Sequence, residues 1–267
     1  MIIFGRILLV TTLFIDLMDS GILYAEEQTP LSMKILYDNQ SYREGLIPGN
    51  GFSCLITGTE KTILFDTGGD GEILLHNMAQ LGISPKQADI LMISHDHEDH
   101  TGGLSSFLER NKEIITYIPT GFPASLIQKI SDHTSNVITV NAPTTICRSA
   151  YSTGAMERNG ITEQSLVLDT KLGLILIVGC AHQGIVNLIR TTTASFKKPV
   201  VFVFGGFHLK DSSKEKIKET LNQFMALGVI GVGGSHCTGT TAMEMFEQFY
   251  GKNYIQMGVG KTIRIKN

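Results

Sequence analysis

Four side chains of the kind that bind divalent metals fall close together in this chain, in the order His95, His97, Asp99 and His100. Imidazole and carboxylate groups are common ligands of Zn²⁺ and related cations. In a chain of 267 residues with eight histidines, the pattern His-x-His-x-Asp-His would arise by chance in about 3 of 10,000 sequences. A His-rich surface loop is the plain alternative. The low chance frequency favours a metal site.

Three isolated histidines downstream repeat one local pattern. His182, His208 and His236 each follow an apolar run and a glycine-containing turn, and helix-like sequence follows each of them. Such turns meet at one edge of an α/β sheet, so residues far apart in the sequence converge there. We therefore predict a site for one or two divalent metals, with a position open for water or substrate. Its predicted ligands are His95, His97, Asp99, His100, His182, His208 and His236.

Three other polar residues, Asp66, His76 and His133, are not expected to bind the metal directly. Asp66 follows an apolar run, and we expect it to support a ligand or a bound water from behind; the alternative is a turn-capping aspartate. His76 lies on a helical face and is expected to be a packed or surface residue. His133 lies in a polar loop and is expected to be exposed. For the isolated histidines, the alternative is an imidazole bonded only to the backbone.

The four cysteines, Cys54, Cys147, Cys180 and Cys237, do not form a Cys-x-x-Cys motif. This excludes a zinc ribbon and a thioredoxin-like motif. They are too few for a disulfide scaffold, and any pairing among them stays open. Cys180 and Cys237 stand beside predicted ligands, so each is either a small apolar packing residue or a thiolate near the metal.

The elements that must position these ligands alternate between strands and helices, without a linker or repeat after residue 30. We therefore predict one domain, 26–267. Predicted strands are 33–37, 53–57, 62–65, 90–93, 114–118, 137–140, 144–147, 165–168, 172–177, 199–204 and 229–232, with short strands at the end. Predicted helices are 71–81, 104–110, 122–131, 184–194, 214–227 and 241–249.

Residues 1–25 are predicted to be a signal peptide. Arg6 precedes the apolar run 7–15, and Ala25 offers a small residue for cleavage, whereas Asp16 and Asp19 depart from the pattern. We expect a periplasmic or secreted protein with no stable membrane insertion after cleavage. An uncleaved anchor and a cytoplasmic chain are the alternatives. The net charge of −3 shows no basic field, so we expect a small-molecule substrate and no nucleic acid.

The motifs together resemble those of the metallo-β-lactamase-fold superfamily. The likeness rests on His95-x-His97-x-Asp99-His100 after Phe65-Asp66-Thr67-Gly68. The motifs Gly-Cys-Ala-His182, Gly-Gly-Phe-His208-Leu and His236-Cys-Thr-Gly are more closely similar to one subgroup. It comprises dihydropterin-methyl-ribofuranosylaminobenzene-phosphate synthase-like metal-dependent hydrolases.

The resemblance implies an α/β fold, an αβ/βα four-layer sandwich of two packed β-sheets flanked by helices. It implies that His95, His97 and His182 bind one metal. It implies that Asp99, His100 and His236 bind the other. Many members place a bridging aspartate at the position of His208, where this chain has an imidazole.

The expected activity is metal-dependent hydrolysis of an ester, phosphoester, thioester or amide by a metal-bound hydroxide. Asp99 is the predicted catalytic residue, orienting the nucleophile or accepting its proton. A pterin-type group transferase that releases pyrophosphate and a non-catalytic metal-binding module are the alternatives. Zinc is the expected metal, with manganese, iron and nickel also compatible with imidazole ligands. Loops 38–51 and 148–163 are expected to line the substrate pocket.

Overall fold

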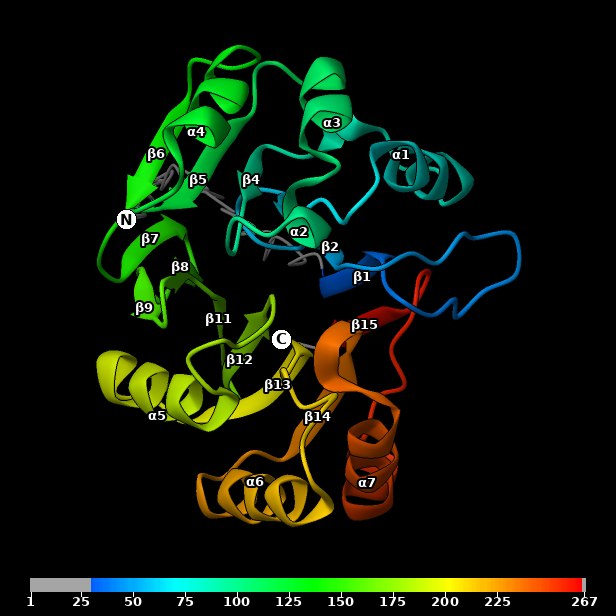
Figure 1. The fold of residues 1–267 in the computed structure, drawn as a ribbon, viewed down its shortest axis with the longest axis vertical. Helices are drawn as coiled ribbons and strands as arrows, with labels where there is room; N and C mark the ends of the chain where they lie inside the picture. Colours follow the sequence, from blue (N-terminus) through cyan, green and yellow to red (C-terminus); the bar gives the residue numbers. More distant parts are fainter. Residues whose placement is uncertain (1–29, 266–267) are drawn as a thin grey trace, which may run out of the picture.

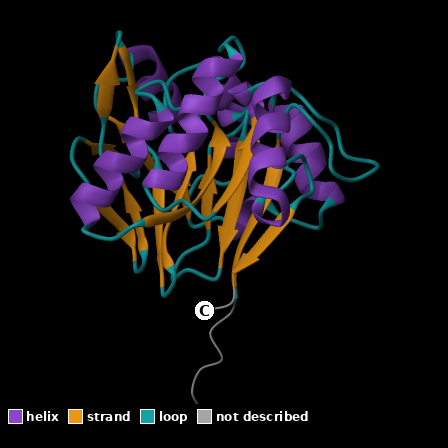
Figure 2. Cartoon of the chain, turned by 90° about the horizontal axis from the view of Figure 1, so that it is seen from below, coloured by secondary structure: helices purple, strands orange, loops and turns teal. Residues whose placement is uncertain are grey.

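The computed structural model describes residues 30–265, so the predicted signal peptide lies outside the described residues. Two β-sheets pack face to face, and helices cover the outer face of each sheet (Figures 1 and 2). The predicted four-layer α/β sandwich is confirmed. None of the helices between residues 30 and 265 has both the length and the apolar character needed to cross a bilayer.

The first sheet has seven strands in the order β15-β1-β2-β3-β4-β5-β6. Strands β3 to β6 are parallel, and the pairs on the β1 side are antiparallel. The strands are β1 Leu31–Tyr37, β2 Ser53–Thr57, β3 Ile63–Phe65, β4 Ile90–Met92, β5 Ile115–Pro119, β6 Val137–Val140 and β15 Thr262–Ile265. The helices of this half are α1 Gly71–Gln80, η1 Pro85–Gln87, α2 Glu98–Thr101, α3 Leu104–Arg110 and α4 Ala124–Ser131.

The second sheet has six strands in the order β14-β13-β12-β11-β8-β7, with β12, β13 and β14 parallel. Its strands are β7 Thr144–Cys147, β8 Ala150–Ser152, β11 Leu166–Thr170, β12 Gly173–Val178, β13 Val200–Gly206 and β14 Gly231–Ser235. Its helices are α5 Ile185–Phe196, α6 Lys214–Ala226, η2 His236–Thr238, α7 Thr240–Tyr250 and η3 Gly251–Asn253.

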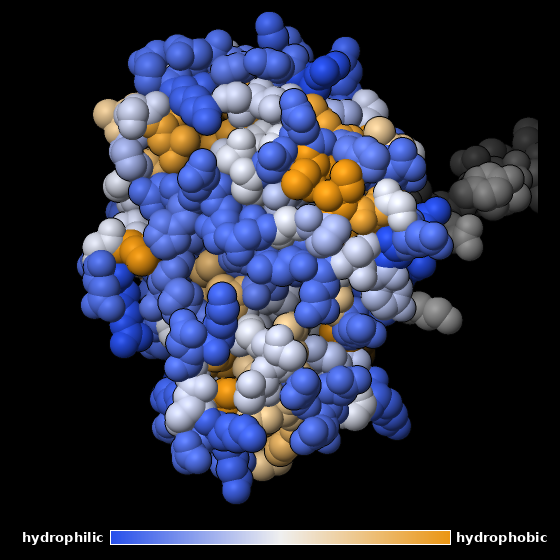
Figure 3. Space-filling view, turned by 45° about the vertical axis from the view of Figure 1, so that its right-hand side comes forward, coloured by the Kyte–Doolittle hydropathy of each residue, from blue (hydrophilic) through white to orange (hydrophobic). Residues whose placement is uncertain are grey.

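Three apolar clusters hold the layers together, one between the sheets and one under each helical layer. Neighbouring residues of a strand point to opposite faces. Phe65 therefore packs between the sheets and Leu64 under the helices of the first half. Burial on both faces explains why these strands are apolar throughout rather than alternating. The face shown in Figure 3 is mainly hydrophilic, with apolar side chains in separate patches.

Residues 148–163 differ from the expected substrate loop. They form β8 and a two-stranded hairpin of β9 Met156–Arg158 and β10 Ile161–Glu163. The hairpin turns at Asn159 and Gly160, both at positive φ (54° and 81°), and an Asn-Gly pair favours such a turn. Strands of three residues give too short a pattern to recognise in the sequence.

Strand β14 also lies further along the chain than predicted, at Gly231–Ser235 rather than 229–232. Its glycines make the sequence look like a loop. Close packing requires them: a Cβ at Gly233 would collide with the Met257 side chain, and a Cβ at Gly234 with that of Thr238.

Candidate metal centre

All seven predicted ligands meet at one edge of the sandwich. They lie just after the ends of β4, β12, β13 and β14, together with the short helix α2. The ring centroids of His95 and His182 are 4.7 Å apart, and those of His100 and His236 are 5.1 Å apart. The convergence expected from the strand-turn pattern is therefore present, and it unites both halves of the fold.

Among the possible metal-binding groups of the described residues, two contain only predicted ligands and together use six of them. We name His95, His97 and His182 the imidazole triad, and Asp99, His100 and His236 the mixed triad. Within each group the ligand atoms all lie within 4.8 Å of one another. A cation bound to nitrogen and oxygen ligands at about 2.0–2.2 Å can lie among atoms so spaced. These are the sets implied by the resemblance.

His208 belongs to neither triad. It is exposed, and its ring centroid lies 4.7 Å from that of His182. The structure groups it with Cys180 and His182 as a further possible set of ligands. His208 therefore lies next to His182 of the imidazole triad. It does not take the place of the bridging aspartate implied by the resemblance, because it belongs to no group that contains a residue of the mixed triad.

Glu163 contacts His182 of the imidazole triad, and it was not predicted from the sequence. This fully buried carboxylate accepts hydrogen bonds from the backbone N–H groups of Cys180 (2.9 Å), Ala181 (2.9 Å) and His182 (2.8 Å). It also lies 3.0 Å from His182 Nδ1, leaving Nε2 for a metal. Burial would raise the pKa of Glu163, but His182 and the N–H groups outweigh it and hold that pKa below its usual value.

Asp66 supports the mixed triad in the corresponding way. Its Oδ2 lies 2.7 Å from His100 Nδ1, and its carboxylate accepts bonds from the N–H (2.6 Å) and the hydroxyl (2.7 Å) of Ser94. Burial alone would lower the pKa of His100, but the Asp66 carboxylate raises it above the usual value. Asn39 Oδ1 lies 2.8 Å from His236 Nδ1. Ser94 and Asn39 were also missed by the sequence analysis.

The site is built on unusual backbone conformations. Seven non-glycine residues of the described chain have positive φ, and four of them lie here: Asp66, Ala181, His208 and His236. Each such conformation costs about 1–3 kcal/mol. Gly179 allows a close approach of the two halves, because a Cβ there would collide with Ser94. The fold thus accepts local strain to bring these turns together.

The buried nitrogens of the site fit a divalent metal. His95 is fully buried, and its Nδ1 lies 2.9 Å from Ser94 Oγ. Its Nε2 has no hydrogen-bond partner, although an unpaired buried polar atom is costly. Burial and the neighbouring imidazoles lower the pKa of His95 well below its usual value, so this ring is a neutral donor.

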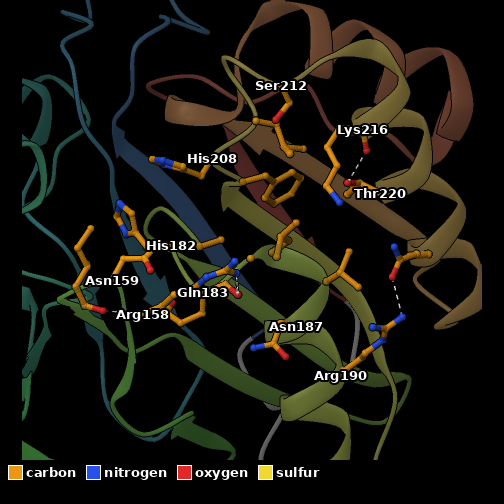
Figure 4. A pocket seen from close by; sticks show the side chains of 18 residues that line it. Arg158, Asn159, His182, Gln183, Asn187, Arg190, His208, Ser212, Lys216 and Thr220 are labelled. Atoms are coloured by element: carbon orange, nitrogen blue, oxygen red, sulfur yellow. Dashed lines mark hydrogen bonds between the residues drawn. The ribbon is translucent and has the colours of Figure 1, made fainter.

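A cavity of about 540 Å³ adjoins the imidazole triad (Figure 4). His182 and His208 lie at one end, and Lys216 and Thr220 of α6 lie on another side (Figure 4). Arg158, Arg190 and Lys216 line it, whereas no Asp or Glu does. Of the two loops predicted to line the pocket, residues 148–163 contribute to this cavity and residues 38–51 do not.

Two of these cations have no carboxylate partner within the described residues. Arg158 donates a hydrogen bond to the Gln183 carbonyl (3.0 Å), and Arg190 donates one to Gln223 Oε1 (2.7 Å). Neither takes part in a salt bridge of residues 30–265. Lys216 is paired with Glu219 at 2.9 Å. The cavity is therefore electropositive and suits an anionic molecule.

The remaining histidines lie outside every possible ligand group of the described chain. His76 is exposed, with Nε2 3.4 Å from the Gly45 carbonyl oxygen. His133 is partly buried rather than fully exposed as expected, with Nδ1 2.9 Å from the Lys129 carbonyl oxygen. Both therefore serve as controls for the histidines of the site.

Known proteins are similar to this chain in sequence and in fold. The family model described as the metallo-beta-lactamase superfamily matches residues 46–126. A 7,8-dihydropterin-6-methyl-4-(beta-D-ribofuranosyl)-aminobenzene-5'-phosphate synthase of Methanocaldococcus jannaschii is 30% identical over 275 residues, covering 85% of this chain and 94% of that protein.

Solved structures give the same picture. Tm1679, a metal-dependent hydrolase of the beta-lactamase superfamily, has a TM-score of 0.74 and 26% identity, covering 89% of this chain and 100% of its own. The metallo-beta-lactamase fold protein YhfI of Bacillus subtilis has a TM-score of 0.63 at 11% identity, covering 88% of this chain and 100% of its own. The likeness to YhfI concerns the fold alone.

Proposed function

The chain belongs to the metallo-β-lactamase superfamily, and from this premise we propose that it is a metal-dependent hydrolase of a small anionic molecule. The bond cleaved would be that of an ester, phosphoester, thioester or amide. One observation carries the proposal: there are two groups of three ligands, each with its ligand atoms within 4.8 Å, and His182 of one group lines a cavity large enough for a small molecule.

The two triads would hold the metals. His95, His97 and His182 would bind one cation. Asp99, His100 and His236 would bind the other. When bound, such a cation supplies Lewis acidity that activates water near neutral pH and polarises the bond to be cleaved. Zinc is the metal we propose, because it suits ligand sets rich in imidazole; manganese, iron and nickel are the alternatives.

Asp99 is the residue we propose for proton handling. Its Oδ2 lies 3.2 Å from His236 Nε2 and accepts a hydrogen bond from Asn50 Nδ2 at 3.3 Å. The contact with His236 and the charge of His100 hold the pKa of Asp99 well below its usual range, despite its partial burial. The carboxylate is therefore ionised at neutral pH and able to orient a nucleophile or accept its proton.

The cavity supports an anionic substrate. Arg158 and Arg190 face it without carboxylate partners, and a guanidinium binds phosphate or carboxylate through two parallel hydrogen bonds. A phosphorylated small molecule is accordingly our first choice. The net charge of −3 gives no support to a nucleic-acid substrate.

Elemental analysis combined with a panel of phosphoesters, thioesters, carboxyl esters and amides tests the proposal. We expect bound zinc and turnover in the natural chain. His97→Ala and Asp99→Asn should abolish turnover while the circular dichroism spectrum stays unchanged. His133→Ala is the matched control and should behave as the natural chain. Undiminished turnover in Asp99→Asn would contradict the assignment of that residue.

A second candidate is a pterin-type group transferase. It is favoured by the 30% identity to the synthase of M. jannaschii. Incubation with a pterin pyrophosphate and an arylamine acceptor separates the two functions, because a transferase forms the condensation product and a hydrolase releases the pterin alcohol. Metal binding without turnover in either assay would instead indicate a non-catalytic metal-binding module.

Export is a separate proposal that rests on residues 1–25 alone. We propose a periplasmic or secreted protein without stable membrane insertion after cleavage. Determination of the mature N-terminus after expression of the full chain tests it. A start at about residue 26 agrees with cleavage after Ala25. An intact Met1 would contradict it.

A further inference from the structure

The buried thiol of Cys180 lies between the two triads. Its Sγ is 3.2 Å from His100 Nε2 and 3.3 Å from Cys237 Sγ. Cys180 occurs in three of the five possible ligand groups of the described chain, more often than any other residue. These groups join it to His95 and His100, to His236 and Cys237, and to His182 and His208.

We propose that Cys180 is a metal ligand whose thiolate bridges the two metal positions. Zinc binds thiolate sulfur at about 2.3 Å and imidazole nitrogen at about 2.0–2.1 Å, so two ligands of one cation lie roughly 3–4 Å apart. The 3.2 Å between Cys180 Sγ and His100 Nε2 falls in this range. Cys180 is grouped with His95 and His182 of the imidazole triad and with His100 and His236 of the mixed triad, so its sulfur lies close to ligands of both cation positions.

The charge of the site supports a thiolate ligand. Asp99 is the only carboxylate in the two triads, and two divalent cations carry four positive charges. A charge taken out of water is costly unless it is paired. His208 brings no charge to replace the bridging aspartate that the resemblance implies at its position. A Cys180 thiolate supplies a second negative ligand at the centre of the site.

Cys237 is assigned a positioning role. Its Sγ lies 3.7 Å from the Cys180 carbonyl oxygen as well as 3.3 Å from Cys180 Sγ, so its thiol can donate to the sulfur of Cys180. Among the five ligand groups it appears in one, and there together with Cys180.

A sulfur ligand favours zinc, cobalt or iron over magnesium and manganese.

Cobalt substitution tests the proposal without any need for turnover. The full chain is freed of metal, reconstituted with Co²⁺ under reducing conditions and examined by absorption spectroscopy. We expect a thiolate-to-cobalt charge-transfer band in the near ultraviolet. The band should disappear in Cys180→Ser and persist in Cys237→Ser. It should be unchanged in Cys147→Ser, a control for a buried thiol of the second sheet that belongs to no ligand group.

A second readout guards against misfolding of the variant. In Cys180→Ala, cobalt affinity should fall at least about tenfold, while the visible bands from the imidazole ligands and the circular dichroism spectrum remain. Thiol labelling should show one cysteine protected by metal in the natural chain and none in this variant.

The proposal rests on the metal centre described above, and the experiment distinguishes failure of the thiolate ligand from failure of the metal centre itself. Cobalt binding with no charge-transfer band overturns the thiolate and leaves the two triads standing. A band that survives Cys180→Ser also overturns it. A Cys180–Cys237 disulfide in protein kept under reducing conditions, seen by mass spectrometry, removes the thiolate and has the same consequence. A chain that binds no cobalt overturns both this proposal and the metal centre.

Discussion

The two triads of the metal centre share one plan but differ in exposure. Each takes two ligands from the turn after β4 and one from the second sheet, His182 or His236. The mixed triad is largely enclosed, since His100 is fully buried and His236 is 7% exposed. The imidazole triad opens outward, with His97 exposed and His182 beside the cavity.

The difference separates two tasks. The ligands of an enclosed group are oriented by hydrogen bonds to neighbouring side chains. Asp66 contacts His100 in this way, and Asn39 contacts His236. An open group leaves room for a substrate to approach. The imidazole triad is therefore the more accessible of the two from the cavity, and the mixed triad is the more firmly held by buried neighbours.

The largest effect is expected from Asp66→Ala. Removing one partner of a buried charged pair costs about 3–5 kcal/mol, and here it also removes the acceptor of the Ser94 N–H. Urea unfolding of the metal-free protein measures the loss. Asp70→Ala, which removes an exposed helix cap, is the matched control and should cost about 1 kcal/mol. Equal losses in both variants would show that the mixed triad is not held by Asp66.

Metal removal should have the next largest effect. Both triads contain ligands from the two halves of the fold, so a bound metal stabilises their association. Zinc at 100 times its dissociation constant adds about 2.7 kcal/mol to the free energy of unfolding. We expect chelation to lower the melting temperature without loss of secondary structure, because three apolar clusters remain. Calorimetry with and without chelator measures it, and an unchanged melting temperature would contradict it.

Glu163→Gln should have a smaller effect, confined to the imidazole triad. The oxygen of the glutamine amide can still accept hydrogen bonds from backbone N–H groups. Its NH₂ group, however, would replace the oxygen that faces the N–H of His182, so two donors would face each other. A buried donor left unpaired costs about 1–3 kcal/mol. Zinc titration should show about 10–100-fold weaker binding at one position and unchanged binding at the other. Weakening at both positions would mean that the two triads do not respond independently.

The smallest effect is expected from pH. The pKa of His100 is raised above 6.5, whereas the pKa values of His95 and His97 are lowered below it. A metal must displace the proton from a ligand that still carries it. As pH falls, the mixed triad should therefore lose zinc before the imidazole triad does, because a proton competes better for His100 than for His95 or His97. Equilibrium dialysis across this range measures the stoichiometry, and simultaneous loss of both metals would contradict the order.

Much of the fold and the outline of the site could be predicted from the sequence. Strands buried on both faces leave continuous apolar runs, and His95 to His100 form a contiguous pattern. His182 and His236 were assigned because each follows a strand and a turn. Glu163 could not be found, because its partner lies 19 residues further along and only the folded hairpin joins them. A single acidic residue in a buried segment is at most a weak signal that it has a partner.

The role of Cys180 was equally hidden. A cysteine beside a histidine is as compatible with packing as with metal binding. Only the approach of the two sheets shows that its sulfur lies 3.2 Å from His100, 80 residues earlier in the chain. The predicted position of strand β14 was wrong because its residues are mostly glycines. They are required by close packing against Met257 and Thr238, which a sequence pattern does not reveal.

The hairpin of β9 and β10 has one further consequence. It carries Arg158 on the wall of the cavity and Glu163 in contact with His182, so a single short ribbon joins the proposed anion site to a proposed metal ligand. We therefore expect an anion bound by Arg158 to restrain the hairpin and, with it, Glu163. Loading of the metal and capture of the small molecule are then energetically linked, and each should tighten the other to the same degree.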